Sequence, residues 1–136
     1  MVELTLAMAE RAVRAAQERA KALGTPMTVT VVDEGGRLVL SARGDGTGFF
    51  TPETSRAKAV AAAAFRRATG EMGKLITEGS PFYMLMPTIV GGEALPTNGG
   101  VPIMRGGRVI GGIGCGGGTG EQDHECALAG AQTAAD

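Results

Sequence analysis

Apolar residues at the start of the chain recur at the spacing of an amphipathic helix. They repeat every three or four positions, with charged residues between them, and the residues of this face are Leu6, Ala9, Val13, Ala16, Ala20 and Leu23. Gly24, with Pro26 soon after it, is a typical stop signal for a helix C-terminus. The pattern therefore predicts a helix over residues 5–23.

The pattern then changes to short runs rich in β-branched residues, separated by turns that contain glycine. Such runs predict strands, and two runs joined by a tight turn predict a β-hairpin. The expected strands are 27–32 and 37–42 in a first hairpin, 88–90 and 94–95 as a short pair, and 101–104 and 108–114 in a second strong hairpin.

The remaining segments have helical signals. Thr51-Pro52-Glu53 combines an N-capping hydroxyl, a proline in the first turn and an acid near the helix dipole, so a helix is expected over 53–69. Residues 71–86 indicate a short helix and an irregular stretch, and 121–134 a last helix. Helices alternate with antiparallel hairpins, which predicts one α+β domain over residues 1–136.

Composition narrows the choice of partners. Thirteen basic and fourteen acidic residues give a net charge of −1. This excludes nucleic acid and an anionic membrane as main partners, because either would need a concentrated basic face. No apolar run reaches the ~18–20 residues of a membrane span, and the N-terminus lacks the basic region of a signal peptide. We expect a cytoplasmic protein.

Glycine is the most unusual part of the composition, with 23 of 136 residues. Small residues let backbones approach closely, so we expect a thin, tightly packed domain that completes its burial by oligomerising. The segment 112–117 matches G-x-G-x-x-G, but no second parallel strand follows it and acids occupy the next helical turn, so no nicotinamide or flavin is expected. The glycines permit either close packing or a planar ligand against bare backbone.

Two ionisable residues are candidates for chemistry. His124 is the only histidine, too few for a typical zinc site, and it is either an ordinary polar position or an iron or haem contact. Lys58 shares a helical face with Ala61 and Phe65. It is expected either to extend its charge to water at the edge of that face or to lie partly buried beside an acid or an anionic ligand.

The segment 43–50 is a glycine-rich loop with two charges and two adjacent aromatic residues. Arg43 and Asp45 either form a salt bridge within the loop or contact a ligand. Two neighbouring phenylalanines in such a loop are not both expected in the core. One of Phe49 and Phe50 is therefore expected to line a pocket or a subunit contact.

The C-terminal third resembles the GlcG/HbpS-like family. The residues that carry the resemblance are Gly99-Gly100-Val101-Pro102-Ile103, Gly107, Val109-Ile110-Gly111-Gly112-Ile113-Gly114, Gly116-Gly117-Gly118-Thr119-Gly120-Glu121-Gln122-Asp123, Cys126-Ala127 and Ala129-Gly130. Upstream, Arg43, Asp45 and Gly46 match the family's R-M-D-G-A signature in part, and Lys58-Ala59 matches its K-A. The sequence departs from the family pattern at Gly44, Thr47, Cys115 and Gly116.

The resemblance implies a five-stranded antiparallel sheet with helices packed on its faces. It also implies self-association into dimers and higher, often octameric, assemblies. Family members include haem-binding sensors, haem-degradation candidates, glycolate-operon proteins and a domain fused to corrinoid adenosyltransferases, so the family suggests tetrapyrrole binding but predicts fold better than function.

The first hypothesis is a protein that binds haem or a corrinoid in a flat apolar slot. The glycines of 114–117 form its floor, roofed by the helix that bears Lys58, and Arg43 and Lys58 meet the propionates. His124, Cys115 and Tyr83 are the candidate axial ligands. The residues expected to contact the cofactor are Arg43, Phe50, Lys58, Gly99, Gly100, Met104, Cys115, Gly116 and Gly117, with His124 as the metal candidate.

Two other hypotheses remain open. One is a cofactor-independent lyase, isomerase or hydrolase acting on a small carboxylated metabolite in a catabolic pathway. In that enzyme Lys58 or Asp45 is the base, Arg43 anchors the carboxylate, and backbone N–H groups near 99–100 or 116–117 stabilise an oxyanion. The other is a structural or regulatory oligomer without a ligand, in which neighbouring side chains fill the slot.

Overall fold

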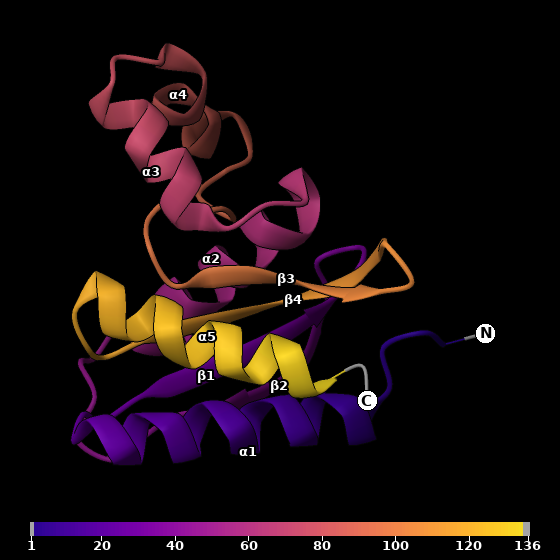
Figure 1. Ribbon diagram of the computed structural model, residues 1–136. Coiled ribbons are helices and arrows are strands. Elements are labelled where there is room, and N and C mark those ends of the chain that lie inside the picture. The colour runs from indigo at the N-terminus through magenta and orange to yellow at the C-terminus, as the bar shows by residue number, and fades with distance from the viewer. Residues whose placement is uncertain (1, 135–136) are drawn as a thin grey trace.

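The computed structural model describes residues 2–134, which form one antiparallel sheet with helices on both faces (Figure 1). The elements are α1 (Leu6–Leu23), β1 (Thr28–Asp33), β2 (Leu38–Ala42), α2 (Thr51–Phe65), α3 (Thr69–Thr77), α4 (Pro81–Ile89), β3 (Gly100–Arg105), β4 (Arg108–Gly116) and α5 (Gly120–Ala134). The strand order is β2-β1-β4-β3. No helix within residues 2–134 has the length and apolar character of a membrane span.

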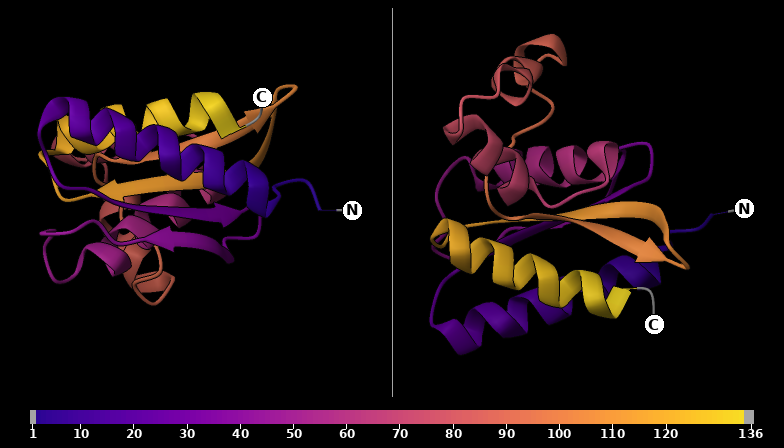
Figure 2. Two further views of the ribbon diagram at one scale, coloured as in Figure 1. Left: turned by 90° about the horizontal axis from the view of Figure 1, so that it is seen from below. Right: turned by 45° about the horizontal axis from the view of Figure 1, so that its top comes forward.

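Two helices cover one face of the sheet and a single helix covers the other. Helices α1 and α5 lie side by side below the sheet, while α2 lies above it (Figures 1 and 2). The main core fills the space between the sheet and the α1–α5 layer, and its largest fully buried side chains include Met27, Ile103, Ile110 and Ile113. The sequence pattern predicted both of these helices. It also predicted the buried face of α1 at Ala9, Val13, Ala16 and Ala20, whereas Leu6 is exposed.

Both predicted strong hairpins are confirmed. Strands β1 and β2 pair antiparallel, with Val29 opposite Ala42, and β3 and β4 pair with Val101 opposite Ile113. Strand β1 also pairs antiparallel with β4, which joins the two hairpins into one sheet. Every strand pair among the described residues is antiparallel, so the segment 112–117 is not part of a βαβ dinucleotide-binding unit.

Glycines make the contact between α2 and the sheet unusually close. A side chain added at Gly112 or Gly114 would collide with the α2 backbone, at the carbonyl oxygens of Ala59 and Ser55. Gly100 on β3 meets the carbonyl of Lys58 in the same way. The glycine floor expected to hold a planar ligand is therefore filled by the main chain of α2, as the close-packing alternative requires.

The sheet has four strands among the described residues, so the five strands implied by the family resemblance are a wrong expectation. Residues 88–90 fall at the end of α4 and 94–95 have no strand. The β-branched run at 88–90 suggested a strand, but Ser80 and Pro81 begin a helix and the Met- and Leu-rich residues after them continue it.

The middle helix is shorter than expected. Helix α2 ends at Phe65, where Arg66 takes a left-handed conformation with φ of 58°, whereas the sequence pattern predicted a helix to residue 69. A separate helix, α3, starts at Thr69. Figure 1 shows that α3 and α4 project from the sheet as an arm, defined here as residues 69–95.

Candidate functional site

Most of the predicted site residues gather at one end of the sheet. Here β1 begins beside the end of β4, because Thr28 pairs with Gly116, and Gly100 pairs with Gly114 at the start of β3. The loop 43–50 and the first turns of α2 and α5 begin at the same end. The antiparallel register therefore brings together segments far apart in the chain.

Lys58 is the buried centre of this end. Its side chain is 8% exposed, and Nζ donates to the carbonyl oxygen of Cys115 at 2.9 Å and to Oδ2 of Asp123 at 3.1 Å. The lysine therefore lies beside an acid, one of its two expected environments. The ion pair joins α2, β4 and α5, and the close approach of Gly99 leaves no room there for another side chain.

Asp123 has a second partner in the chain. Its Oδ1 accepts a hydrogen bond from the backbone N–H of Gly118 at 2.9 Å. Burial raises the pKa of this carboxyl above its ordinary value, although the Lys58 cation and the Gly118 N–H oppose that rise. The carboxylate is thus held by two donors in a place that would not tolerate it without them.

The two cysteines are closed off from ligands. Cys115 and Cys126 are free thiols with no exposed surface, and both belong to the main core. Burial raises the pKa of Cys115 well above its usual value and that of Cys126 to about 11. Cys115 therefore lies in the structure as a protonated core side chain and not as an accessible axial ligand.

Buried hydroxyls fasten the loop 43–50 to the sheet. Thr28 Oγ1 on β1 lies 3.0 Å from Thr47 Oγ1 and 2.8 Å from Thr51 Oγ1, and it accepts from the backbone N–H of Gly44. This network holds the path of the loop while its charged and aromatic side chains remain outside.

The exposed side chains of the loop are those with predicted roles. Arg43 and Asp45 both face water, and neither forms an ion pair with any residue in 2–134. Phe49 and Phe50 are exposed and pack edge to face, with their ring centroids 5.1 Å apart. The loop salt bridge is thus not formed, and the cation of Arg43 is available to an anion.

Phe50 lines an apolar groove beside α2. The groove has a volume of about 310 Å³ and lies between the first half of α2 and the end of the arm. Its walls are Phe50, Glu53, Thr54, Ala57, Pro87, Gly92, Ala94 and Leu95. Only one of these eight residues is ionisable, which makes the groove a suitable surface for the face of an apolar ring.

A smaller hollow of about 200 Å³ adjoins the groove and adds a cation to its border. It shares Glu53, Ala57 and Gly92 with the groove and adds Arg56 and Glu93. Arg56 is exposed and forms no ion pair within the described part of the chain. A ligand that seats an apolar body in the groove therefore finds a free guanidinium at the edge.

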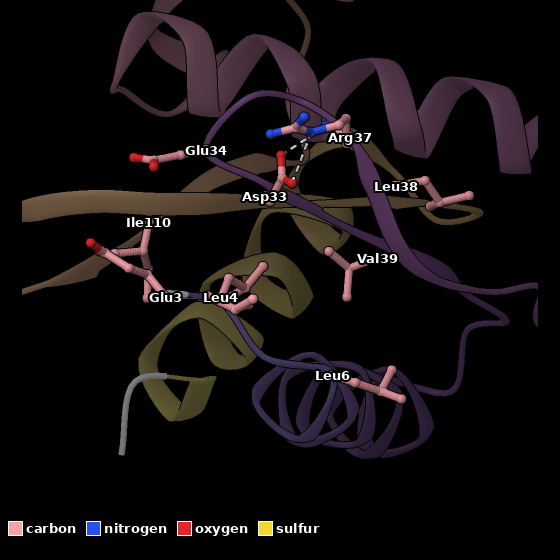
Figure 3. Close-up of a pocket in the computed structure, with 10 residues that line it drawn as sticks. Glu3, Leu4, Leu6, Asp33, Glu34, Arg37, Leu38, Val39 and Ile110 are labelled. Atoms are coloured by element: carbon pink, nitrogen blue, oxygen red, sulfur yellow. Dashed lines mark hydrogen bonds and ion pairs between the residues drawn. The ribbon is translucent and has the colours of Figure 1, made fainter.

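A larger pocket of about 410 Å³ lies at the opposite end of the sheet (Figure 3). Apolar residues such as Leu4 and Leu38 share its lining with four ionisable ones, namely Glu3, Asp33, Glu34 and Arg37. Arg37 pairs with Asp33, and Arg108 pairs with both glutamates. None of the candidate site residues from the sequence lines this pocket, and its carboxylates disfavour an anionic ligand.

The structure separates the remaining candidates from the groove. Met104 lies near the β3–β4 turn at the far end of the sheet, so it does not share a slot with Phe50. Tyr83 packs against Phe65 and Phe82 in the arm, with Arg67 above its ring. Residues 99, 116 and 117 are at the predicted end of the sheet, where they meet neighbouring protein atoms.

His124 lies in the first turn of α5, whereas the groove lies beside α2, across the sheet. Its Nδ1 is buried and has no hydrogen-bond partner within the described part of the chain. Residues 2–134 contain no group of three or more metal-ligating His, Cys, Asp or Glu side chains. An iron contact at His124 would therefore use the imidazole alone, as an axial haem ligand does.

Sequence reasoning missed two features of the site. Asp123 was considered only among the acids of the helical turn after the glycine segment, because its pairing with Lys58 depends on the meeting of α2 and α5 in space. Arg56 and the arm residues Pro87 and Leu95 were not singled out. In the sequence Arg56 is an ordinary charged position on a helix, so no signal there marked the border of the groove.

Comparison with known proteins gives consistent matches over nearly the whole chain. The family model for haem degrading protein HbpS-like matches residues 4–132. The corrinoid adenosyltransferase PduO of Salmonella typhimurium is 34% identical over 114 residues, covering 84% of this chain and 34% of PduO. This chain thus resembles one part of that longer protein.

Two solved structures share both fold and sequence. The PduOC:heme complex is 30% identical with a TM-score of 0.88, and the match covers 97% of this chain and 95% of PduOC. HbpS is 33% identical with a TM-score of 0.86, covering 97% of this chain and 90% of HbpS.

Proposed function

Because the chain belongs to the HbpS-like family of haem-degrading proteins, we propose that it binds haem or a closely related tetrapyrrole in the apolar groove beside α2. The groove is the observation that carries the location. The wall of the groove has one ionisable residue, Glu53, and its border adds Arg56 together with Glu93, whereas the pocket at the other end is lined by three carboxylates and one arginine. The PduOC:heme structure supports the ligand class.

The residues of the groove fit a tetrapyrrole ring better than its iron. Phe50, Pro87 and Leu95 offer apolar surface to the ring, and Arg56 in the adjoining hollow is free to meet a propionate, whereas Arg43 lines neither hollow. The oxygen donors among the lining residues are Glu53 and Thr54. The groove is also smaller than the ring and open to solvent, so an edge of the tetrapyrrole would remain outside it.

Cys115 and Lys58 have no direct role in this proposal. The thiol is buried, and the lysine is held by a carbonyl and a carboxylate, so neither reaches the groove. Their contribution is to fix α2, which forms one wall. The enzyme alternative stays a prediction. Its two candidate bases lie apart, since Lys58 is buried, Asp45 is exposed, and the two share no cavity described above.

Absorbance titration with haemin tests the proposal. Wild-type protein at micromolar concentration is expected to shift the Soret band with saturation. Phe50→Asp is expected to weaken binding at least tenfold, because it places a carboxylate on the apolar wall. The matched control is Leu6→Asp, which adds the same charge at an exposed leucine of the pocket in Figure 3.

Three results would overturn parts of the proposal. If wild-type protein gives no Soret shift, haem is not the ligand, and the same titration with a corrinoid tests the related class. If Leu6→Asp weakens binding and Phe50→Asp does not, the groove is the wrong site. If His124→Ala alone removes the shifted band, the iron is bound across the sheet and not beside α2.

We also propose that the chain self-associates into dimers or larger assemblies, up to octamers. The scarcity of large core residues and the exposed apolar side chains support this proposal. A cytoplasmic location stays a prediction.

A further inference from the structure

Helix α4 is apolar on all sides. No charged residue occurs between Glu78 and Glu93, and the helix itself reads PFYMLMPTI. A helix that is hydrophobic all round is normally buried. In a single copy α4 lies at the outside of the arm, where only part of its surface has protein to cover it (Figure 1).

One side of α4 packs within the arm. Met86 joins Met72, Ala61 and Ala94 in a small core, and Tyr83 packs against the same cluster. The other side carries Phe82, Leu85 and Ile89, with exposed fractions of 57%, 62% and 83%. These three residues follow helical spacing, so they form one stripe, here called the α4 stripe.

The exposed area around the α4 stripe is large enough for a stable dimer. The three residues of the α4 stripe leave roughly 400 Å² exposed, taking ordinary side-chain areas. Phe49 and Phe50 add roughly 300 Å². They are continuous with α4 through the groove, where Phe50 and Pro87 share a wall. A standard interface buries about 800 Å² per partner.

We propose that the α4 stripe is the contact between two copies of this chain, related by a two-fold axis through Leu85. The inference rests on the proposed self-association and does not depend on haem binding. In a two-fold contact the same residues meet from both sides. Leu85 then packs on the partner's Leu85, and Phe82 packs on the partner's Ile89.

The stripe suits a second copy because it is self-complementary. It carries no charge, so two identical stripes meet without repulsion or unpaired ions. Leu85 is its middle residue, so an antiparallel crossing centred there buries all three residues in both copies. The same contact places the groove next to the interface, where the second copy shields it from water.

The first measurement is oligomeric state by native mass spectrometry and light scattering. Wild-type protein is expected to be at least a dimer, and Leu85→Lys is expected to raise its dissociation constant at least a hundredfold. The matched control, Leu38→Lys, changes another exposed leucine, 50% exposed against 62% for Leu85, outside the α4 stripe, and is expected to keep the wild-type mass. Circular dichroism verifies that both variants fold.

The second measurement is a cross-link that keeps the surface apolar. Leu85→Cys places a thiol on the axis, and mild oxidation is expected to join two copies covalently. Both native cysteines have no exposed surface, so they do not compete. Leu38→Cys is the control and is expected to remain uncross-linked at equal concentration.

Each contrary outcome overturns a different statement. A monomeric wild-type protein overturns self-association itself. An oligomer that survives in folded Leu85→Lys overturns the α4 stripe as the contact, as does equal loss of mass in Leu38→Lys. Failure of Leu85→Cys to cross-link overturns the two-fold axis at Leu85, and this result stands even if the lysine variant does not fold.

Discussion

Replacing Lys58 with methionine is expected to leave the buried carboxylate of Asp123 without its cationic partner. The variant keeps the length and apolar stem of the side chain but removes the cation 3.1 Å from Asp123. Breaking a buried ion pair from one side costs about 3–5 kcal/mol, because the remaining charge is left without its partner. That is a large part of the roughly 5–15 kcal/mol that stabilises an ordinary domain.

The loss is expected to depend on pH with a defined sign. Burial already raises the pKa of Asp123 above the ordinary 3.8, and Lys58 opposes the rise. A carboxyl with a raised folded-state pKa contributes most to stability below pH 3.8, and that contribution falls as pH rises through the folded-state value. Removing the cation raises that value further, so the deficit of Lys58→Met grows from pH 4 to pH 7.

Urea denaturation at several pH values measures both effects. Lys74→Met removes an exposed lysine and is the control, expected within about 0.5 kcal/mol of wild type. Lys58→Met with Asp123→Asn removes the stranded charge and retains an acceptor for the Gly118 N–H, so it is expected to be more stable than Lys58→Met alone. A deficit below 1 kcal/mol at pH 7, or one that shrinks as pH rises, would refute the reasoning.

Two further predictions concern packing and thiol chemistry. Gly114→Ala is expected to destabilise the fold by about 1–3 kcal/mol or more in thermal or urea unfolding, because the methyl group meets the carbonyl oxygen of Ser55 on α2. Gly48→Ala, whose added carbon has only ordinary contact with a methyl group, is expected to stay near wild type, and equal stability of the two variants would contradict the close packing. Cys115 and Cys126 are expected not to react with Ellman's reagent at pH 8 until the protein is unfolded. Both thiols are buried, and the pKa of Cys126 is about 11. Rapid labelling of the folded protein would contradict this burial.

The sequence correctly predicted those helices and strands for which the local sequence preference and the tertiary packing favour the same structure. The 5–23 helix has a clear apolar face and a glycine stop, and both hairpins have β-branched strands around glycine turns. The strand predicted at residues 88–90 is wrong, because Thr88, Ile89 and Val90 favour a strand locally but lie at the end of a helix. The capping residues eight positions earlier, together with packing in the arm, favoured the helix.

The site was harder to predict because its parts meet only in three dimensions. Lys58 was recognised as unusual from its apolar helical face, but Asp123 lies 65 positions later, so no spacing rule connects them. The glycines were recognised as positions of close approach, yet the sequence left open whether a ligand or a helix approaches. The α2 backbone occupies that space.

The glycine contact between α2 and β4 has a consequence for anything that docks beside this helix. The position of α2 is set by main-chain atoms in direct contact and by one buried ion pair, with few rotatable side chains between helix and sheet. A molecule that settles against α2 thus meets a preorganised wall and loses little free energy in ordering it. Selectivity there would come from the other wall, which the side chains of the arm supply.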